Sequence, residues 1–271
     1  MLAPLVFDGF EIVFHTRGMW VRRYLGLSRL WSPFLPECQS RKKDAWFGLK
    51  TAGFLTVLFE LAPVYATRIP EPVSSLFPDF LWAGDPGGRE VHLTFDDGPH
   101  PEWTPRILDL LGASGHKATF FCVGQNVERY PKVFERIQSE GHSWGNHTMH
   151  HESGWSTGQY AYLKSFLECE AITKSGLFRP PYGRMTRSQA KAISKRSCIV
   201  MWNLLTGDFD QKRTVSQCLN STRAHLSPGT IAVMHDSQKA SPRTLGLLEG
   251  VLRTLQDQGW MGAPLDMPIR P

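Results

Sequence analysis

The sequence predicts an α/β fold in which short buried strands alternate with helices around a mostly parallel sheet. Three observations support this class. Apolar segments of strand length recur from residue 91 onward, amphipathic segments separate most of them, and Gly115, Gly141 and Gly229 stand where helices would end and strands begin. Strands that alternate with helices favour a parallel sheet with right-handed crossovers, and six or more such units can close into a barrel.

The expected elements follow one another at regular intervals. Strands are predicted at residues 91–95, 118–122, 143–146, 177–179, 198–204 and 230–235. Helices are predicted at residues 105–111, with Thr104 as a candidate cap, and at 131–140, 160–173, 188–195, 215–226 and 245–258. Polar motifs follow several of these strands directly. In parallel α/β folds the strand ends that face the loops carry the chemistry, so these motifs are the candidate site.

Residues 1–63 differ from the remainder of the chain. They mix aromatic and apolar residues with a basic run at residues 41–43 and show no alternation of strands and helices. We expect an N-terminal extension over 1–63 and one domain over 64–271. The apolar stretch 52–66 is shorter than the ~20 residues that span a bilayer. Three interpretations stay open: a helix docked on the domain, a membrane-associating or export segment within 41–66, or a start assigned too far upstream.

The composition sets limits on partners and redox chemistry. The net charge of +5 and the isoelectric point near 9.0 describe a mildly basic protein whose charges are scattered, so we expect no nucleic-acid partner. The five cysteines form no CxxC pair and their number is odd. Neither a zinc knuckle nor a full disulfide framework is therefore indicated, and the cysteines do not indicate a compartment.

The pair Asp96 and Asp97 ends the strand at residues 91–95 and is followed by Gly-Pro. Adjacent buried carboxylates repel one another unless a cation offsets their charge. His147 and His151 are spaced so that both would lie on one side of a helical turn and reach one ion, whereas His150 would point away. One Asp and two His form a plausible ligand set for a catalytic divalent metal, which leaves the other Asp as a base.

Two further strand ends carry charged side chains. Arg179 begins the rigid Arg-Pro-Pro-Tyr-Gly loop, and an arginine beside a catalytic carboxylate keeps it ionised and oriented. A surface salt bridge is the alternative role for this arginine. His235 ends the strand at 230–235, where it is a candidate general acid.

Together the motifs Thr-Phe-Asp-Asp-Gly-Pro at 94–99, His-Thr-Met-His-His at 147–151, Arg-Pro-Pro-Tyr-Gly at 179–183 and Val-Met-His-Asp at 233–236 resemble, in order and spacing, those of the polysaccharide deacetylase family, carbohydrate esterase family 4. The similarity covers about residues 64–271. It implies a distorted (β/α) barrel that uses a divalent metal, zinc first with cobalt or nickel as alternatives, to remove acetyl groups from N-acetylated sugars of a chitin- or peptidoglycan-like polymer.

The resemblance also implies roles for individual residues. Asp97, His147 and His151 would hold the metal. Asp96 would be the general base, oriented by Arg179, and His235 would be the general acid. The family's fourth motif, Asp-x-x-Asp-Trp, departs here to Leu205, Thr206, Gly207, Asp208 and Phe209. Asp208 is then expected to be the charged partner of either Arg179 or His235.

Two other functions are compatible with the same residues. An esterase that removes O-acetyl groups from a polysaccharide uses the same metal, base and acid. A non-catalytic, metal-dependent carbohydrate-binding protein would be favoured if a ligand or the acid were missing, and neither is. A metalloprotease is disfavoured because the sequence has no His-Glu-x-x-His motif. A cell-wall substrate would favour the cell envelope or an extracytoplasmic location.

Overall fold

The computed structural model describes residues 5–7, 10–15, 18–23, 67–69 and 74–265. The chain divides into two compact units, Met1–Ala66 and Thr67–Pro271. The predicted boundary between residues 63 and 64 lies outside the described residues and stays a prediction, as does the membrane-associating segment at 41–66. Within the described ranges, no helix is both long and apolar enough to cross a membrane.

The first unit contains a small antiparallel sheet that was not among the predicted strands. Its strands are β1 (Leu5–Phe7), β2 (Phe10–His15) and β3 (Gly18–Arg23), in the order β1-β2-β3. Each strand pairs antiparallel with its neighbour in the sequence. This local pairing explains why the stretch lacks the strand–helix alternation of a parallel fold.

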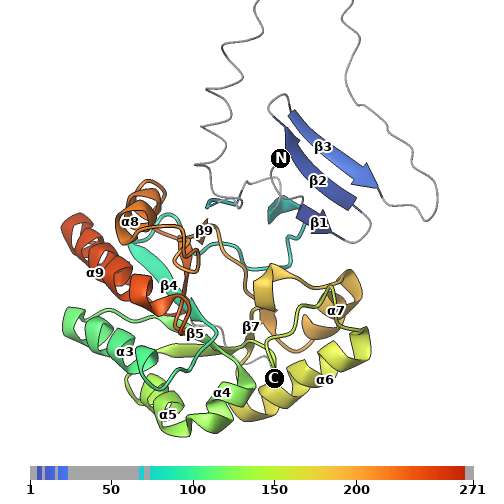
Figure 1. The fold of residues 1–271 in the computed structure, drawn as a ribbon, viewed down its shortest axis with the longest axis horizontal. Coiled ribbons are helices and arrows are strands. Elements are labelled where there is room, and N and C mark those ends of the chain that lie inside the picture. The colour runs from blue at the N-terminus through green and yellow to red at the C-terminus, as the bar shows by residue number, and fades with distance from the viewer. Residues whose placement is uncertain (1–4, 8–9, 16–17, 24–66, 70–73, 266–271) are drawn as a thin grey trace, which may run out of the picture. The chain divides into compact units, whose positions relative to one another are not determined.

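The second unit is built on a curled parallel sheet in the order β8-β7-β6-β5-β4-β10-β9 (Figure 1). The strands are β4 (Glu90–Asp96), β5 (Thr119–Cys122), β6 (Ser143–Asn146), β7 (Leu177–Phe178), β8 (Cys198–Ile199), β9 (Leu204–Leu205) and β10 (Ile231–His235). A short strand, β11 (Met261–Gly262), pairs with the start of β4. Among the described strands, β8 and β9 end the sheet without pairing to each other, so the barrel is incomplete. The predicted distorted (β/α) barrel is confirmed.

Helices follow most strands and lie outside the sheet (Figure 1). They are α3 (Trp103–Ser114), α4 (Gly124–Arg129), α5 (Pro131–Ser139), α6 (Gln159–Thr173), α7 (Arg187–Ile193), α8 (Val215–Arg223) and α9 (Ser241–Gln258), and a 3-10 turn, η1, lies at Pro181–Gly183. Helix α4 was not predicted. The expected cap was also wrong, since α3 begins after Glu102 and Thr104 lies inside the helix, where its hydroxyl accepts the backbone N–H of His100.

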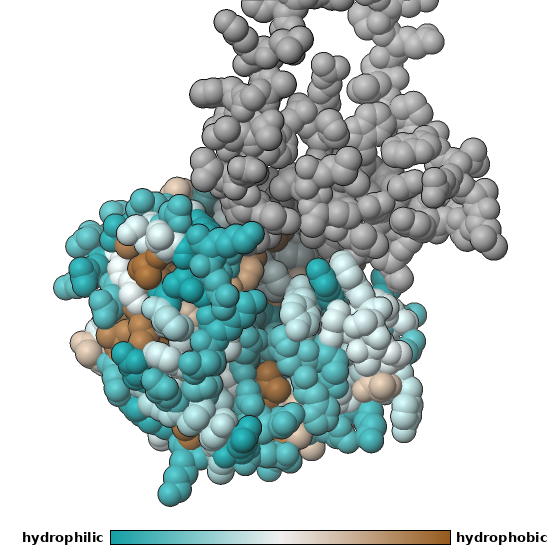
Figure 2. All heavy atoms as spheres, viewed as in Figure 1, coloured by the Kyte–Doolittle hydropathy of each residue, from teal (hydrophilic) through white to brown (hydrophobic). Residues whose placement is uncertain are grey.

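The alternation of side chains along β4 separates the core from the site. Val91, Leu93 and Phe95 are fully buried and belong to the main hydrophobic cluster with residues of α3 and α9. Thr94 and Asp96 occupy the alternate positions, so they project from the opposite face of the sheet. On the face shown in Figure 2, the described residues are mainly hydrophilic, with hydrophobic side chains in small separate spots. Strand β4 thus contributes Val91, Leu93 and Phe95 to the core through one face and Asp96, the first catalytic candidate, through the other.

The predicted strand at 198–204 is interrupted, and the interruption has a physical cause. Residues 198–199 form β8 and residues 204–205 form β9, with no strand between them. The carbonyls of Val200 and Met201 each accept a hydrogen bond from the Arg179 guanidinium, at 3.3 and 2.9 Å. A buried arginine needs acceptors for all its donors, so the chain bends away from regular pairing to supply them.

Candidate active site

Asp97, His147 and His151 converge beyond the carboxyl ends of β4 and β6. One potential ligand atom from each residue lies within 4.8 Å of the other two. The Asp97 Oδ1 atom lies 3.0 Å from Nε2 of His151 and 3.8 Å from Nε2 of His147. The three residues predicted to bind a metal are therefore brought together, and among the described residues they form the one cluster of this kind.

The hydrogen bonding of His147 leaves one ring nitrogen available for a cation. Its Nδ1 lies 2.7 Å from the carbonyl oxygen of Arg179, which can only accept, so Nδ1 carries the proton. The Nε2 lone pair then points to the Asp97 side. A backbone carbonyl that accepts the other ring N–H is the usual device that orients a metal-ligating histidine.

The charge states also suit a cation. Burial lowers the pKa of His147 to about 4, although nearby Asp96 opposes this, so the imidazole is neutral at physiological pH. Burial alone would raise the pKa of Asp97. The hydrogen bond from His151 and the charges of His235, His151 and His147 outweigh it and hold that pKa well below its usual range. The donor set is thus two imidazole nitrogens and one carboxylate, which fits a transition metal.

The backbone at this cluster is strained. Asp97, Thr148 and His151 have positive φ angles of 83°, 63° and 60°, and Tyr182 nearby has 60°. Left-handed conformations cost non-glycine residues ~1–3 kcal/mol each and concentrate at functional sites. The predicted helical turn across His147 and His151 is wrong, because this segment is a loop after β6. The left-handed conformation at His151, and not a helical repeat, accompanies the approach of its ring to Asp97.

Asp96 is paired with Arg179 in the interior of the barrel. The Arg179 side chain has no exposed surface and donates to Asp96 Oδ1 at 2.7 Å and to the Thr94 hydroxyl at 2.6 Å. Its guanidinium also stacks over the Phe121 ring at 4.0 Å. Burial lowers the pKa of Arg179, and the Asp96 carboxylate opposes this change. Arg179 therefore pairs with the carboxylate and fixes its orientation, and the surface salt bridge considered as an alternative is excluded.

His235 is paired with Asp208, which settles the choice of partner left open by the sequence. The two side chains meet at 2.9 Å between His235 Nδ1 and Asp208 Oδ1, and Asp208 Oδ2 accepts the backbone N–H of His235 at 2.7 Å. Burial alone would lower the pKa of His235. The charge and the hydrogen bond of the Asp208 carboxylate, together with smaller contributions from the charges of Asp97 and Asp96, raise that pKa to about 10. His235 is therefore protonated at neutral pH, as a general acid must be.

Supporting residues complete both pairs, and sequence patterns did not identify them. Thr244, on α9, donates to Asp208 Oδ2 at 2.7 Å, and the Thr206 hydroxyl lies 3.3 Å from Oδ1. Thr94 could have been suspected, because it lies two residues before Asp96 and so on the same face of β4. No signal in the sequence connects Thr244 to Asp208, since the two are far apart along the chain.

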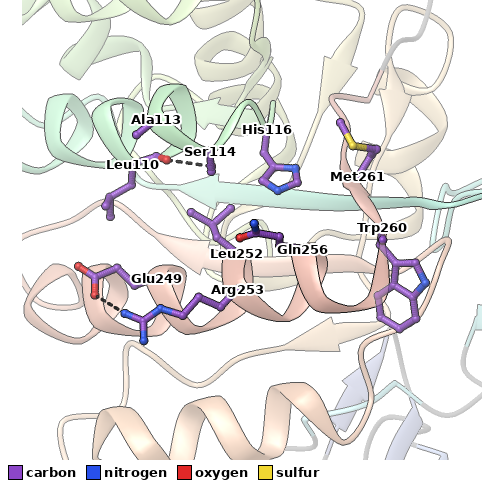
Figure 3. Close-up of a pocket in the computed structure, with 11 residues that line it drawn as sticks. Leu110, Ala113, Ser114, His116, Glu249, Leu252, Arg253, Gln256, Trp260 and Met261 are labelled. Carbon is purple, nitrogen blue, oxygen red and sulfur yellow. Dashed lines mark hydrogen bonds and ion pairs between the residues drawn. The ribbon is translucent and has the colours of Figure 1, made fainter.

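A pocket elsewhere on the domain contains none of these groups. It lies between α3 and α9 beside β11 and has a volume of about 600 Å³ (Figure 3). Its lining includes His116, Arg253, Trp260 and Met261. The Nδ1 atom of His116 accepts the backbone N–H of Gly262 at 2.9 Å, so this histidine has a structural role. The catalytic candidates lie instead at the carboxyl ends of the strands.

Comparison with known proteins identifies the family. The polysaccharide deacetylase family model matches residues 83–197. A chitooligosaccharide deacetylase of a Bradyrhizobium species is 33% identical over 158 residues, which cover 55% of this chain and 72% of the relative. The chain belongs to the polysaccharide deacetylase family. The candidate metal cluster and the Asp96–Arg179 pair lie inside the matched segment. The Asp208–His235 pair lies after it in the sequence, and the pairing of β10 with β4 places His235 beside Asp96.

Two further comparisons agree with this membership. A peptidoglycan N-acetylglucosamine deacetylase of Bacillus cereus is 34% identical over 165 residues, covering 58% of this chain and 60% of the relative's length. A crystal structure of a peptidoglycan N-acetylglucosamine deacetylase in complex with 4-naphthalen-1-yl-N-oxidanyl-benzamide matches with a TM-score of 0.67 at 29% identity. It covers 73% of this chain and 95% of the solved one. Of the Bacillus cereus relative that is 34% identical, by contrast, the chain spans 60% of the length.

Proposed function

We propose that this member of the family is a metal-dependent hydrolase that removes N-acetyl groups from amino sugars of a polysaccharide or oligosaccharide. One observation carries the proposal: a candidate metal cluster with a paired carboxylate, Asp96–Arg179, and a paired imidazolium, Asp208–His235, close to it. Amide hydrolysis at a metal needs this combination of a cation, a base and an acid. The relatives named as peptidoglycan and chitooligosaccharide deacetylases support the choice of substrate class.

Asp97, His147 and His151 would hold the cation, and we infer zinc, because two imidazoles and one carboxylate with open positions suit that ion. Cobalt and nickel accept similar ligands. When bound, the ion would lower the pKa of water and polarise the acetamide carbonyl. The fit rests on the free Nε2 of His147, which its Nδ1 hydrogen bond to the Arg179 carbonyl defines.

Asp96 and His235 then have complementary tasks. Asp96 accepts the proton from the attacking water as the new carbon–oxygen bond forms, while Arg179 keeps the carboxylate in place. The backbone N–H of Tyr182 would donate to the developing oxyanion. As the carbon–nitrogen bond breaks, Nε2 of His235 donates its proton to the leaving amine, since Nδ1 is engaged by Asp208. The products are acetate and a free amino sugar.

The decisive experiment combines metal content and acetate release. Purified protein should contain about one transition ion per chain, and it should release acetate from N-acetylglucosamine oligomers in a manner that chelation abolishes and zinc restores. Metal content without acetate release would redirect the search to O-acetylated polymers. Failure to bind metal after reloading would contradict the assignment of Asp97, His147 and His151.

A substrate of this kind would be a cell-wall or extracellular polymer. We therefore infer a location at the cell envelope or outside the cytoplasm. Fractionation of cells that produce the full chain, followed by detection with an antibody, tests this directly. Recovery in the soluble cytoplasmic fraction alone would contradict it.

A further inference from the structure

An exposed arginine lies next to the candidate metal cluster. Tyr182 is 60% exposed, and its ring centroid lies 4.7 Å from that of His151. The guanidinium carbon of Arg184 lies 5.9 Å from the Tyr182 ring and 4.9 Å from the Trp155 ring. Arg184 is thus the cation on an aromatic surface that begins at His151, a member of the candidate metal cluster.

The guanidinium of Arg184 is available for a ligand. Within the described part of the chain it forms no ion pair and no side-chain hydrogen bond, and its contacts are the two aromatic rings. By contrast, Arg136 pairs with Asp109 and Arg196 with Glu170. A guanidinium stacked on an aromatic face keeps its in-plane N–H donors free, and their fork matches the two oxygens of a carboxylate.

The aromatic surface is held in place by an interlocked pair of loops. The backbone N–H of Gly154 donates to the Arg184 carbonyl at 3.0 Å, and the Trp155 indole N–H donates to the Met185 carbonyl at 3.3 Å. The buried Gln189 side chain donates to the Gly154 carbonyl at 3.0 Å. A Cβ atom at Gly154 would lie 2.5 Å from Gln189 Oε1 and 2.7 Å from the Arg184 carbonyl, so only glycine fits. Arg184 therefore projects from a fixed platform.

We propose that Arg184, with Trp155 and Tyr182, forms a subsite for a carboxylate carried by the sugar next to the one that loses its acetyl group. This inference rests on the proposed function and specifies its substrate class. It favours glycans that alternate N-acetylglucosamine with a carboxylate-bearing amino sugar, as peptidoglycan strands do, over neutral chitin oligomers. The carboxylate has two possible sources, the lactyl ether of the sugar itself or a peptide attached to it.

The test compares glycans that differ only in this group. Acetate release by the zinc-loaded full chain is measured on four glycans. The first is neutral chitotetraose, and the second is the peptide-free tetrasaccharide of alternating N-acetylglucosamine and N-acetylmuramic acid. The third is that tetrasaccharide with its lactyl carboxylates converted to methyl amides, and the fourth is its peptide-bearing form. The variants are Arg184→Ala, Arg184→Lys and the control Arg253→Ala. The control removes one exposed charge from α9, where Arg253 lines the separate pocket of Figure 3.

Arg184→Ala should lower kcat/KM for a carboxylate-bearing glycan about 10- to 100-fold, mainly through KM, because it removes a hydrogen bond to a charged group. Arg184→Ala should change kcat/KM for chitotetraose by no more than about twofold. The preference of the wild type for carboxylate-bearing glycans over chitotetraose should become smaller in high salt, which screens the charge interaction. Arg184→Lys should recover part of the loss, and Arg253→Ala should change nothing. The arm that responds, peptide-free or peptide-bearing, identifies the source of the carboxylate.

Equal losses on neutral and anionic glycans, or no loss on either, would overturn the subsite. It would also be overturned if kcat/KM on the methyl amide equalled that on the better of the two carboxylate-bearing glycans. Failure of the proposed function would look different, because the wild type would then release acetate from none of the glycans. In that case calorimetric binding of the same glycans to wild type and Arg184→Ala still decides the inference. Equal affinities of the two proteins for every glycan would refute it.

Discussion

The pairing of His235 with Asp208 predicts a specific change in the pH dependence of activity. The pKa of His235 is raised to about 10 from its ordinary 6.5 in spite of burial, and Asp208 is the largest of the groups that raise it. Replacing Asp208 with Asn keeps the shape and removes the charge. An opposite charge in direct contact changes a pKa by about 1–3, so the pKa of His235 should fall by roughly that much in the variant.

The sign follows from the role of His235 as an acid. The proton must be present for the amine to leave, so activity falls as pH rises through the pKa of His235. In Asp208→Asn the alkaline limb of the kcat/KM profile should move to a pH about 1–3 units lower. At a pH above both limbs, kcat/KM of the variant should be lower than that of the wild type by about tenfold for each pH unit of this shift. In the metal-loaded enzyme the cation offsets the Asp97 charge, so the wild-type limb should itself lie below pH 10.

The assay is acetate release from N-acetylglucosamine oligomers across the neutral and alkaline range, with metal content checked at each pH. Asp210→Asn is the matched control, because it removes the same charge from the same loop, whereas the carboxylate in contact with the His235 ring belongs to Asp208. An alkaline limb that does not move in Asp208→Asn, or that moves equally in Asp210→Asn, would refute the assignment of His235 as the acid tuned by Asp208.

The other charged groups of the site lead to four more predictions. Asp96→Asn should reduce turnover about 10²- to 10⁴-fold while the metal content measured by plasma mass spectrometry survives, and retention of most activity would contradict the base assignment. His151→Ala should lose the metal on dialysis, whereas the exposed neighbour variant His150→Ala should keep it; equal metal contents would refute the ligand assignment. Arg179→Met should lower the free energy of unfolding, measured by urea denaturation, by about 3–5 kcal/mol, because it leaves the Asp96 carboxylate buried without its partner. A decrease below about 1 kcal/mol would contradict this. In metal-free protein the raised pKa of His235 should make the unfolding free energy fall as pH rises from 6.5 towards 10, and His235→Gln should flatten that slope.

The sequence predicted the second unit well where the local pattern and the tertiary structure agree. The strand at 143–146 was predicted with the observed bounds, and the strands that became β4, β5, β7 and β10 were predicted within one residue at each end. Their apolar periodicity is enforced by burial in the sheet, which leaves a strong local signal. Helix α4 was missed because its six residues start with glycine and carry no long amphipathic pattern.

The strand predicted at 198–204 failed for a reason that no local pattern contains. Its residues are apolar and β-branched enough to form one strand, yet Val200 and Met201 turn their carbonyls to a guanidinium from another part of the chain. The cost of leaving arginine donors unpaired in the interior exceeds the gain from a few more ladder hydrogen bonds. Tertiary demand thus overrides propensity at the position where the barrel stays open.

The site shows a similar division between composition and geometry. The spacing of His147 and His151 pointed to two histidines that do lie together beside Asp97, but through the wrong structure, because a strained loop and not a helix presents them. What the sequence could identify was the chemistry: acids, imidazoles and an arginine placed after strands. What it could not identify was the pairing, which depends on where the strand ends meet.

The departure of the fourth motif illustrates this dependence on geometry. Its one retained carboxylate, Asp208, supplies the oxygens that contact both the ring and the backbone N–H of His235. The apolar Leu205, at the position of the lost acid, lies on β9 and pairs with Val233. A family pattern can therefore lose one charged position and keep the pairing of carboxylate and histidine, provided that the carboxylate which contacts the histidine is the one retained.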